Sequence, residues 1–135
     1  MAQTTKRDDK AFLAEYGDKL SDTVRRAKWI ADAGEHADHD GQTLATRNHD
    51  VIRAWAEGRR AKPATIGGTE HEGRAGVLRF DFPGYGEGGR LEHIDWDRWF
   101  ETFDERELVF LYQEKLKSGD QSNFFKLDSP HRQEG

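Results

Sequence analysis

The chain has 135 residues, of which 34% are hydrophobic and 35% are charged, a formal net charge of −5, and no cysteine. This length is typical of one domain, and the low apolar content predicts a small core rich in aromatic side chains, which bury a large area each. The lack of cysteine excludes a disulfide framework and thiolate metal sites; with no leading apolar segment and no run long enough to cross a bilayer, the sequence predicts a cytoplasmic protein.

The first third of the chain predicts helices and a loop. Residues 9–20 place apolar side chains, among them Phe12, at helical spacing on one face. Ser21 is a candidate N-cap for a second helix in residues 22–33. Residues 34–47 are polar and flanked by glycine, which is typical of a loop.

The next segment predicts a helix that starts at His49, after a cap at Asn48 or Thr46. Its apolar residues share one face, and Asp50 and the following arginines suit the two ends of the helix dipole. Pro63 ends this segment.

The back half of the chain holds seven of the eight Phe residues and alternates between strand-like and helical patterns. The spacing predicts strands over residues 64–66, 77–82, 91–94, 108–112 and 123–127. Between the third and fourth of these, Asp95 is a candidate N-cap for a short helix with an aromatic stripe made of Trp96, Trp99, Phe100 and Phe103. The fold expected is α+β: a small, mostly antiparallel sheet of four or five strands with one short Trp/Phe-rich helix and N-terminal helices.

Composition divides the chain into three expected parts. Residues 1–45 form a helical and loop extension, residues 46–129 form the α+β core domain, and residues 130–135 form a disordered tail. The high charge of residues 1–10 also favours disorder there.

Four pieces of the sequence, HDVIRAWAE, PATI, GVLRFDFPGY and the W–F–FDE–LVFLYQ block, fall within residues 43–129. Together they resemble a family of small bacterial proteins to which no activity is assigned. The resemblance implies a domain body in residues 46–129, and it implies no catalytic residue or cofactor.

Charge is distributed unevenly along the chain. Residues 47–79 carry seven Lys/Arg and four Asp/Glu (7 − 4 = +3), whereas residues 80–107 carry three and nine (3 − 9 = −6). Such polarity can steer a partner. The binding surface that we expect joins the basic helix to the strand and loop that follow, and consists of Arg53, Arg59, Arg60, Arg79 and Tyr85.

The segment 35–50 is rich in histidine and acids. His36 and His39 are three residues apart, and His49 or an acid could complete the ligands of one zinc ion. A solvated polar loop explains the same residues without a metal.

Other patterns do not define a reaction. The acids on the aromatic helix are explained by a solvated face, and the glycines of residues 84–90 lack the spacing of a phosphate-binding loop. We therefore expect a small cytoplasmic, non-enzymatic binding or accessory protein without a cofactor. Its partner is expected to be a protein rather than a nucleic acid or a membrane. The alternatives are a metal-dependent enzyme using residues 35–50, a nucleic-acid-binding protein using the Arg-rich helix 48–62, and a structural subunit of a larger assembly.

Overall fold

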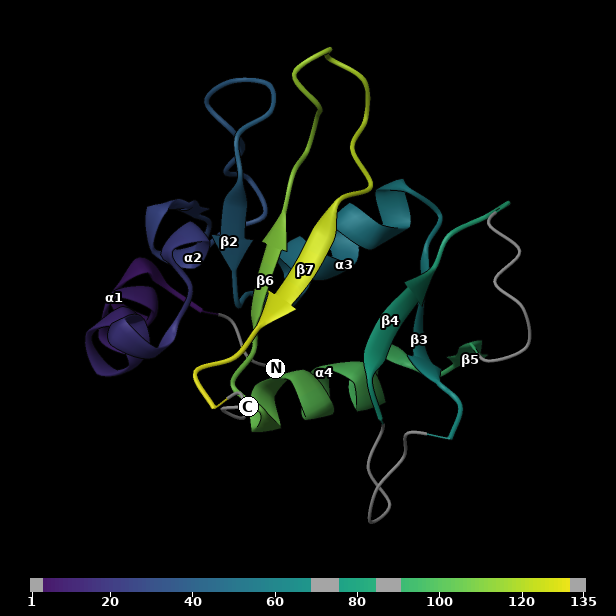
Figure 1. Cartoon of the computed structure of the whole chain (residues 1–135). Helices are drawn as coiled ribbons and strands as arrows, with labels where there is room; N and C mark the ends of the chain where they lie inside the picture. Colours follow the sequence, from purple (N-terminus) through teal and green to yellow (C-terminus); the bar gives the residue numbers. More distant parts are fainter. Residues whose placement is uncertain (1–3, 69–75, 85–90, 132–135) are drawn as a thin grey trace. The chain divides into compact units, whose positions relative to one another are not determined.

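The computed structural model describes residues 4–68, 76–84 and 91–131 (Figure 1). The chain divides into two compact units, Met1–Ala54 with Glu107–Gly135 and Trp55–Arg106. Described residues form helices and seven strands in mostly antiparallel sheets, which confirms the α+β class. The strands are distributed over a four-stranded and a three-stranded sheet.

The first unit opens with helix α1 (Lys6–Tyr16), the 3₁₀ helix η1 (Gly17–Lys19) and helix α2 (Asp22–Arg26). Thr5 caps α1 in a reciprocal box with Asp8, so disorder in residues 1–10 is wrong from Lys6 onward. Ser21 caps α2 as expected. The helix nevertheless ends at Arg26 rather than near residue 33, because Lys28–Trp29 pairs as a strand.

The sheet of this unit has the order β1-β2-β6-β7, with bounds β1 (Lys28–Trp29), β2 (Leu44–Thr46), β6 (Val109–Tyr112) and β7 (Phe125–Asp128). Only the β1–β2 pair is parallel. β2 corrects the expectation of a loop over residues 34–47. Its three residues are buried and pair with β6. The polar residues around this short strand gave the segment the sequence pattern of a loop. β6 is the expected central strand, buried along its whole length.

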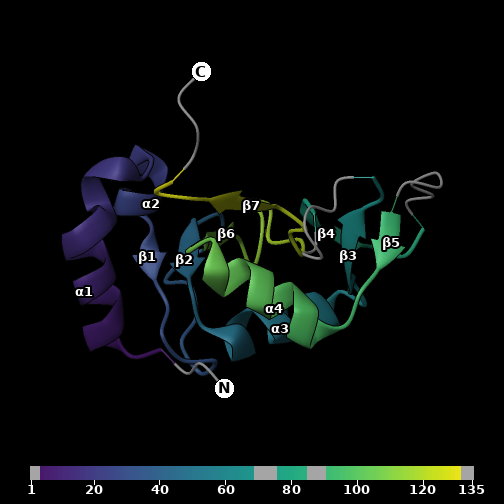
Figure 2. The ribbon, with the colours of Figure 1, turned by 90° about the horizontal axis from the view of Figure 1, so that it is seen from below.

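Helices α1 and α2 pack on one face of this sheet. Phe12, Leu20 and Val24 form a buried cluster with side chains from β2 and β6, which include Ala45 and Leu111. Figure 2 shows α1 and α2 beside β1 and β2. On the opposite face of the sheet, aromatic rings of β6 and β7 stack on one another.

Helix α3 (His49–Gly58) begins where the sequence predicts, and the Asn48 side chain accepts a hydrogen bond from the Val51 N–H (3.1 Å). The helix ends in a Schellman arrangement. The Ala61 N–H donates to the Ala56 carbonyl (2.9 Å), and Arg60 holds the left-handed conformation (φ 55°) that usually favours glycine.

The second unit contains a three-stranded antiparallel sheet with the order β4-β3-β5 and the helix α4 (Trp96–Glu105). The strands are β3 (Lys62–Ile66), β4 (Leu78–Asp81) and β5 (Leu91–His93). Asp95 caps α4 by accepting from the Arg98 N–H (2.8 Å), as predicted.

An aromatic core fills the inner side of this sheet. The Phe80 ring stacks on Trp99 with centroids 5.1 Å apart and also contacts Trp55 and Trp96. The Trp99 indole donates a hydrogen bond to the Arg79 carbonyl (3.1 Å), so the buried ring has no unsatisfied donor. The aromatic stripe predicted for this helix is therefore its core-facing side.

Candidate functional site

The strand register of the second unit sorts its side chains onto two sides of the sheet. Alternate residues of a strand point to opposite faces, and residues directly paired across strands share a face. Lys62 pairs with Asp81, and Ala64 pairs with both Arg79 and His93. Their common side, which we call the outer face, thus contains Lys62, Ala64, Ile66, Arg79, Asp81, Leu91 and His93. Pro63, Thr65, Leu78 and Phe80 point to the aromatic core.

The ionisable side chains of the outer face reach solvent. Lys62, Arg79 and His93 are exposed, whereas Ala64 at the centre is fully covered. The His93 Nε2 atom lies 2.6 Å from Asp81 Oδ2. The Arg79 guanidinium donates to the carbonyl of Leu78 (3.1 Å). The three-stranded sheet therefore presents three basic side chains and one acid on one side.

The end of α3 adds two arginines to the basic residues of this unit. The Arg59 guanidinium lies 4.4 Å from the centroid of the Trp55 ring and donates to the Trp55 carbonyl (2.9 Å). Trp55 is only 5% exposed, since it belongs to the aromatic core. Arg60 is exposed and directly precedes Ala61 and β3. Arg59 thus covers a core ring, while the Arg60 side chain faces solvent.

The structure places the other predicted binding residues differently. Arg53 is an exposed residue of α3 and belongs to the first unit. Tyr85 lies outside the described residues. The sequence prediction did not include Asp81 and His93, although the alternation of Arg79 and Asp81 in one strand was a usable signal. The pairing of β3 with β5, which brings His93 to the same side, had no local signal.

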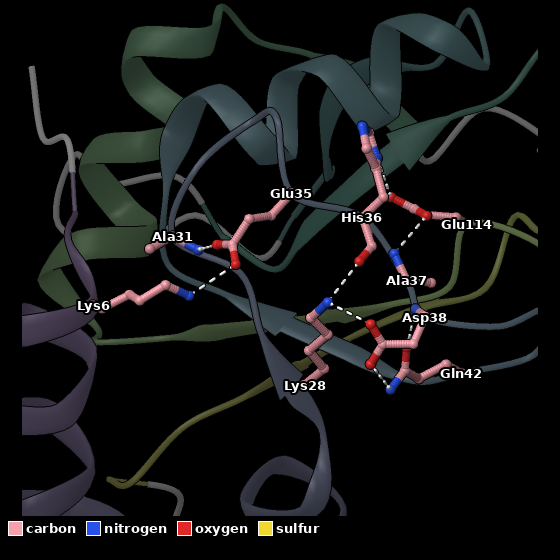
Figure 3. Close-up of polar contacts among 9 residues, drawn as sticks. All are labelled: Lys6, Lys28, Ala31, Glu35, His36, Ala37, Asp38, Gln42 and Glu114. Atoms are coloured by element: carbon pink, nitrogen blue, oxygen red, sulfur yellow. Dashed lines mark hydrogen bonds and ion pairs between the residues drawn. The ribbon is translucent and has the colours of Figure 1, made fainter.

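The histidine-rich segment is a loop held by polar contacts, shown in Figure 3. Lys28 Nζ lies between the His36 carbonyl and the Asp38 carboxylate, 2.9 Å from each. Lys6 reaches Glu35 at 2.8 Å. This hydrogen bond from Lys6 lowers the pKa of Glu35, and the hydrogen bond from Lys28 lowers the pKa of Asp38.

The three histidines of the metal prediction have separate environments. His36 Nδ1 contacts Glu114 (2.8 Å), His39 Nδ1 contacts the Asp40 carbonyl (3.1 Å), and His49 is the first residue of α3. Within residues 4–68, 76–84 and 91–131, no group of three or more His, Asp or Glu side chains is arranged to hold a metal ion. The contacts of the loop are those of a solvated polar segment folded onto its neighbours.

A second polar cluster joins α1 to the end of the first unit. Glu107 has a left-handed backbone (φ 53°), and its Oε1 accepts a hydrogen bond from the Tyr16 hydroxyl (2.9 Å) and lies 2.6 Å from His131 Nε2. The bond to Glu107 raises the pKa of Tyr16 to about 12, and the contact with His131 lowers the pKa of Glu107. Of the tail expected over residues 130–135, residues 132–135 lie outside the described chain.

Two described acids of the first unit are buried, Asp9 of α1 and Asp128 of β7. Asp9 of α1 is 5% exposed, and burial raises its pKa to about 6, although the charge of Arg47 acts in the opposite direction. The Arg47 guanidinium also lies 4.3 Å from the centroid of the Phe12 ring. Asp9 is thus a carboxyl whose charged form is disfavoured by folding.

Comparison with protein-family models, with curated proteins and with solved structures finds no match. No helix in the described part of the chain is both long enough and apolar enough to span a membrane.

Proposed function

We propose that the protein is a small, non-enzymatic binding protein of the cytoplasm, whose partner is another protein. The contact surface is the outer face of the β4-β3-β5 sheet together with Arg60 at the end of α3. The observation that carries this proposal is the strand register, which sets Lys62 and Arg79 on the solvent side of a sheet whose other side is a closed aromatic core.

The position of Arg60 supports a role for its side chain. A residue with a side chain in the left-handed region costs roughly 1 kcal/mol relative to glycine. Here an arginine takes that position at the end of α3 and keeps its side chain exposed. A binding role explains a conformational cost that the fold itself would avoid with glycine.

The environment of Trp55 favours a protein over a nucleic acid. Binding of single strands relies on aromatic rings that are free to stack on bases. Trp55 is 5% exposed and lies under the Arg59 guanidinium, so its ring is committed to the core. The outer face also carries the Asp81 carboxylate, which would repel phosphates, and the whole chain has a net charge of −5.

The test is affinity capture with the tagged full-length chain from a lysate of the source cells, with and without nuclease. The variant Arg60→Glu/Arg79→Glu reverses two charges of the surface. Lys117→Glu/Lys126→Glu is the matched control, because it makes the same charge change on exposed residues of the first unit. We expect nuclease-resistant capture of one protein, with at least a tenfold loss for the first variant and none for the control.

Two outcomes contradict the proposal. Capture that disappears with nuclease would assign the surface to nucleic acid, and equal losses in both variants would show that only net charge matters. Circular dichroism of each variant establishes that the fold is retained.

A further inference from the structure

The outer face carries a histidine–carboxylate contact that connects its two outer strands. Asp81 lies on β4 and His93 on β5, and the strand between them contributes Ala64. The methyl side chain of Ala64 leaves room for the two longer side chains to meet above it, with His93 Nε2 and Asp81 Oδ2 2.6 Å apart. The pair is exposed enough to exchange protons with solvent, since its side chains are 53% and 34% accessible.

We infer that this face recognises an acidic segment of the partner protein, and that the Asp81–His93 pair makes the recognition stronger at lower pH. The inference rests on the proposed function and names the chemistry of the partner. It follows from charge complementarity between a basic sheet surface and carboxylates on the partner.

The charges on the outer face can be counted from the register. Lys62 of β3 and Arg79 of β4 contribute two positive charges, and Asp81 contributes one negative charge. The described strand residues of this face therefore carry +1 when His93 is neutral (2 − 1 = +1). Protonation of His93 raises this to +2. Among the described residues, the nearby acid Asp95 is engaged with the Arg98 N–H as the cap of α4.

The pair also determines how much of the positive charge of Lys62 and Arg79 is offset by Asp81. Asp81 is the direct cross-strand neighbour of Lys62 and lies two residues from Arg79 on the same side of β4. A neutral His93 leaves the negative charge of Asp81 uncompensated, so that it attracts both cations, whereas a protonated His93 neutralises it. Histidine is the side chain that most commonly changes charge near neutral pH.

A labelled oligoglutamate peptide is the probe, and fluorescence anisotropy at low ionic strength is the measurement, at pH 6, 7 and 8. The peptide remains ionised over this range. We expect the wild-type chain to bind roughly two to five times more tightly at pH 6 than at pH 8, as the interaction energies of exposed charges allow. Asp81→Asn should bind the peptide more tightly at pH 8 by a similar factor.

His93→Gln is the decisive variant, because it removes the titrating group and keeps a polar side chain. It should remove the pH dependence, while His39→Gln, an exposed histidine of the first unit, should keep it. Lys62→Glu/Arg79→Glu should abolish binding at every pH. Circular dichroism checks that each variant is folded.

The inference is overturned if His93→Gln retains the wild-type pH dependence, if Asp81→Asn does not bind more tightly, or if the peptide does not bind. In those cases the proposed function still stands, provided that Arg60→Glu/Arg79→Glu loses the captured protein. Tighter binding of a single-stranded oligonucleotide than of the peptide would instead contradict both.

Discussion

Replacing Asp9 with Asn tests whether a buried acid of α1 opposes folding. The pKa of Asp9 is about 6 in the folded chain, above its ordinary value of 3.8, because burial disfavours the charged form. The unfolded chain therefore releases this proton more readily than the folded chain. The resulting penalty is absent below about pH 4, grows between pH 3.8 and about 6, and is complete above that.

The size of the effect follows from the difference between the two values. A shift from 3.8 to about 6 is roughly two units, and each unit corresponds to about 1.4 kcal/mol. The penalty at pH 7.5 is thus at most ~3 kcal/mol. Asn gives up the interaction of a carboxylate with the start of the helix, which is worth about 0.3–1 kcal/mol. The expected net gain in the free energy of unfolding is about 2 kcal/mol at pH 7.5.

Urea denaturation followed by circular dichroism at pH 4, 6 and 7.5 measures this gain, and NMR of the Asp9 carboxyl carbon reports its titration directly. Asp18→Asn is the control, since Asp18 is exposed in η1. We expect Asp9→Asn to exceed wild type at pH 7.5 and to match it near pH 4. A carboxyl titrating near its ordinary value, or a loss of stability in Asp9→Asn at pH 7.5, would refute the reasoning.

Three further predictions concern caps, the core and the tyrosine. Asp95→Ala should lower the free energy of unfolding by about 1 kcal/mol because α4 loses its N-cap. Glu101→Ala, on the exposed side of that helix, should change it by less than about 0.5 kcal/mol. Equal midpoints of urea denaturation for these two variants would contradict the prediction. Trp99→Ala should lower the free energy of unfolding by about 3–5 kcal/mol. Trp99→Phe should lower it less, because the ring position remains filled, although the hydrogen bond to the Arg79 carbonyl is lost. Equal losses for the two variants in urea denaturation would contradict this prediction. Glu107→Gln should return the pKa of Tyr16 from about 12 toward its ordinary value of 10.0, because Glu107 is the main cause of the shift; NMR titration of ring-labelled tyrosine would show no change if burial were the cause.

The local elements of this protein were determined by short stretches of sequence. Ser21 and Asp95 cap helices as predicted, because a side-chain oxygen three residues before an amide satisfies that amide without help from the rest of the fold. The alternation in residues 77–82 correctly placed Phe80 inward and Arg79 outward, since the strand period is a property of the backbone. The buried strand β6 was recognisable from its apolar run alone.

Only the tertiary structure decided which strands meet. Lys28–Trp29 and Leu44–Thr46 carry no clear strand pattern, and they become strands because they pair with one another and with β6, which lies far along the chain. The outer face depends on the same kind of contact: His93 meets Asp81 because β3 pairs on both sides, a relation between three separate segments. Pairing between distant strands depends on long-range packing and hydrogen bonding, and no spacing of residues within one segment encodes it.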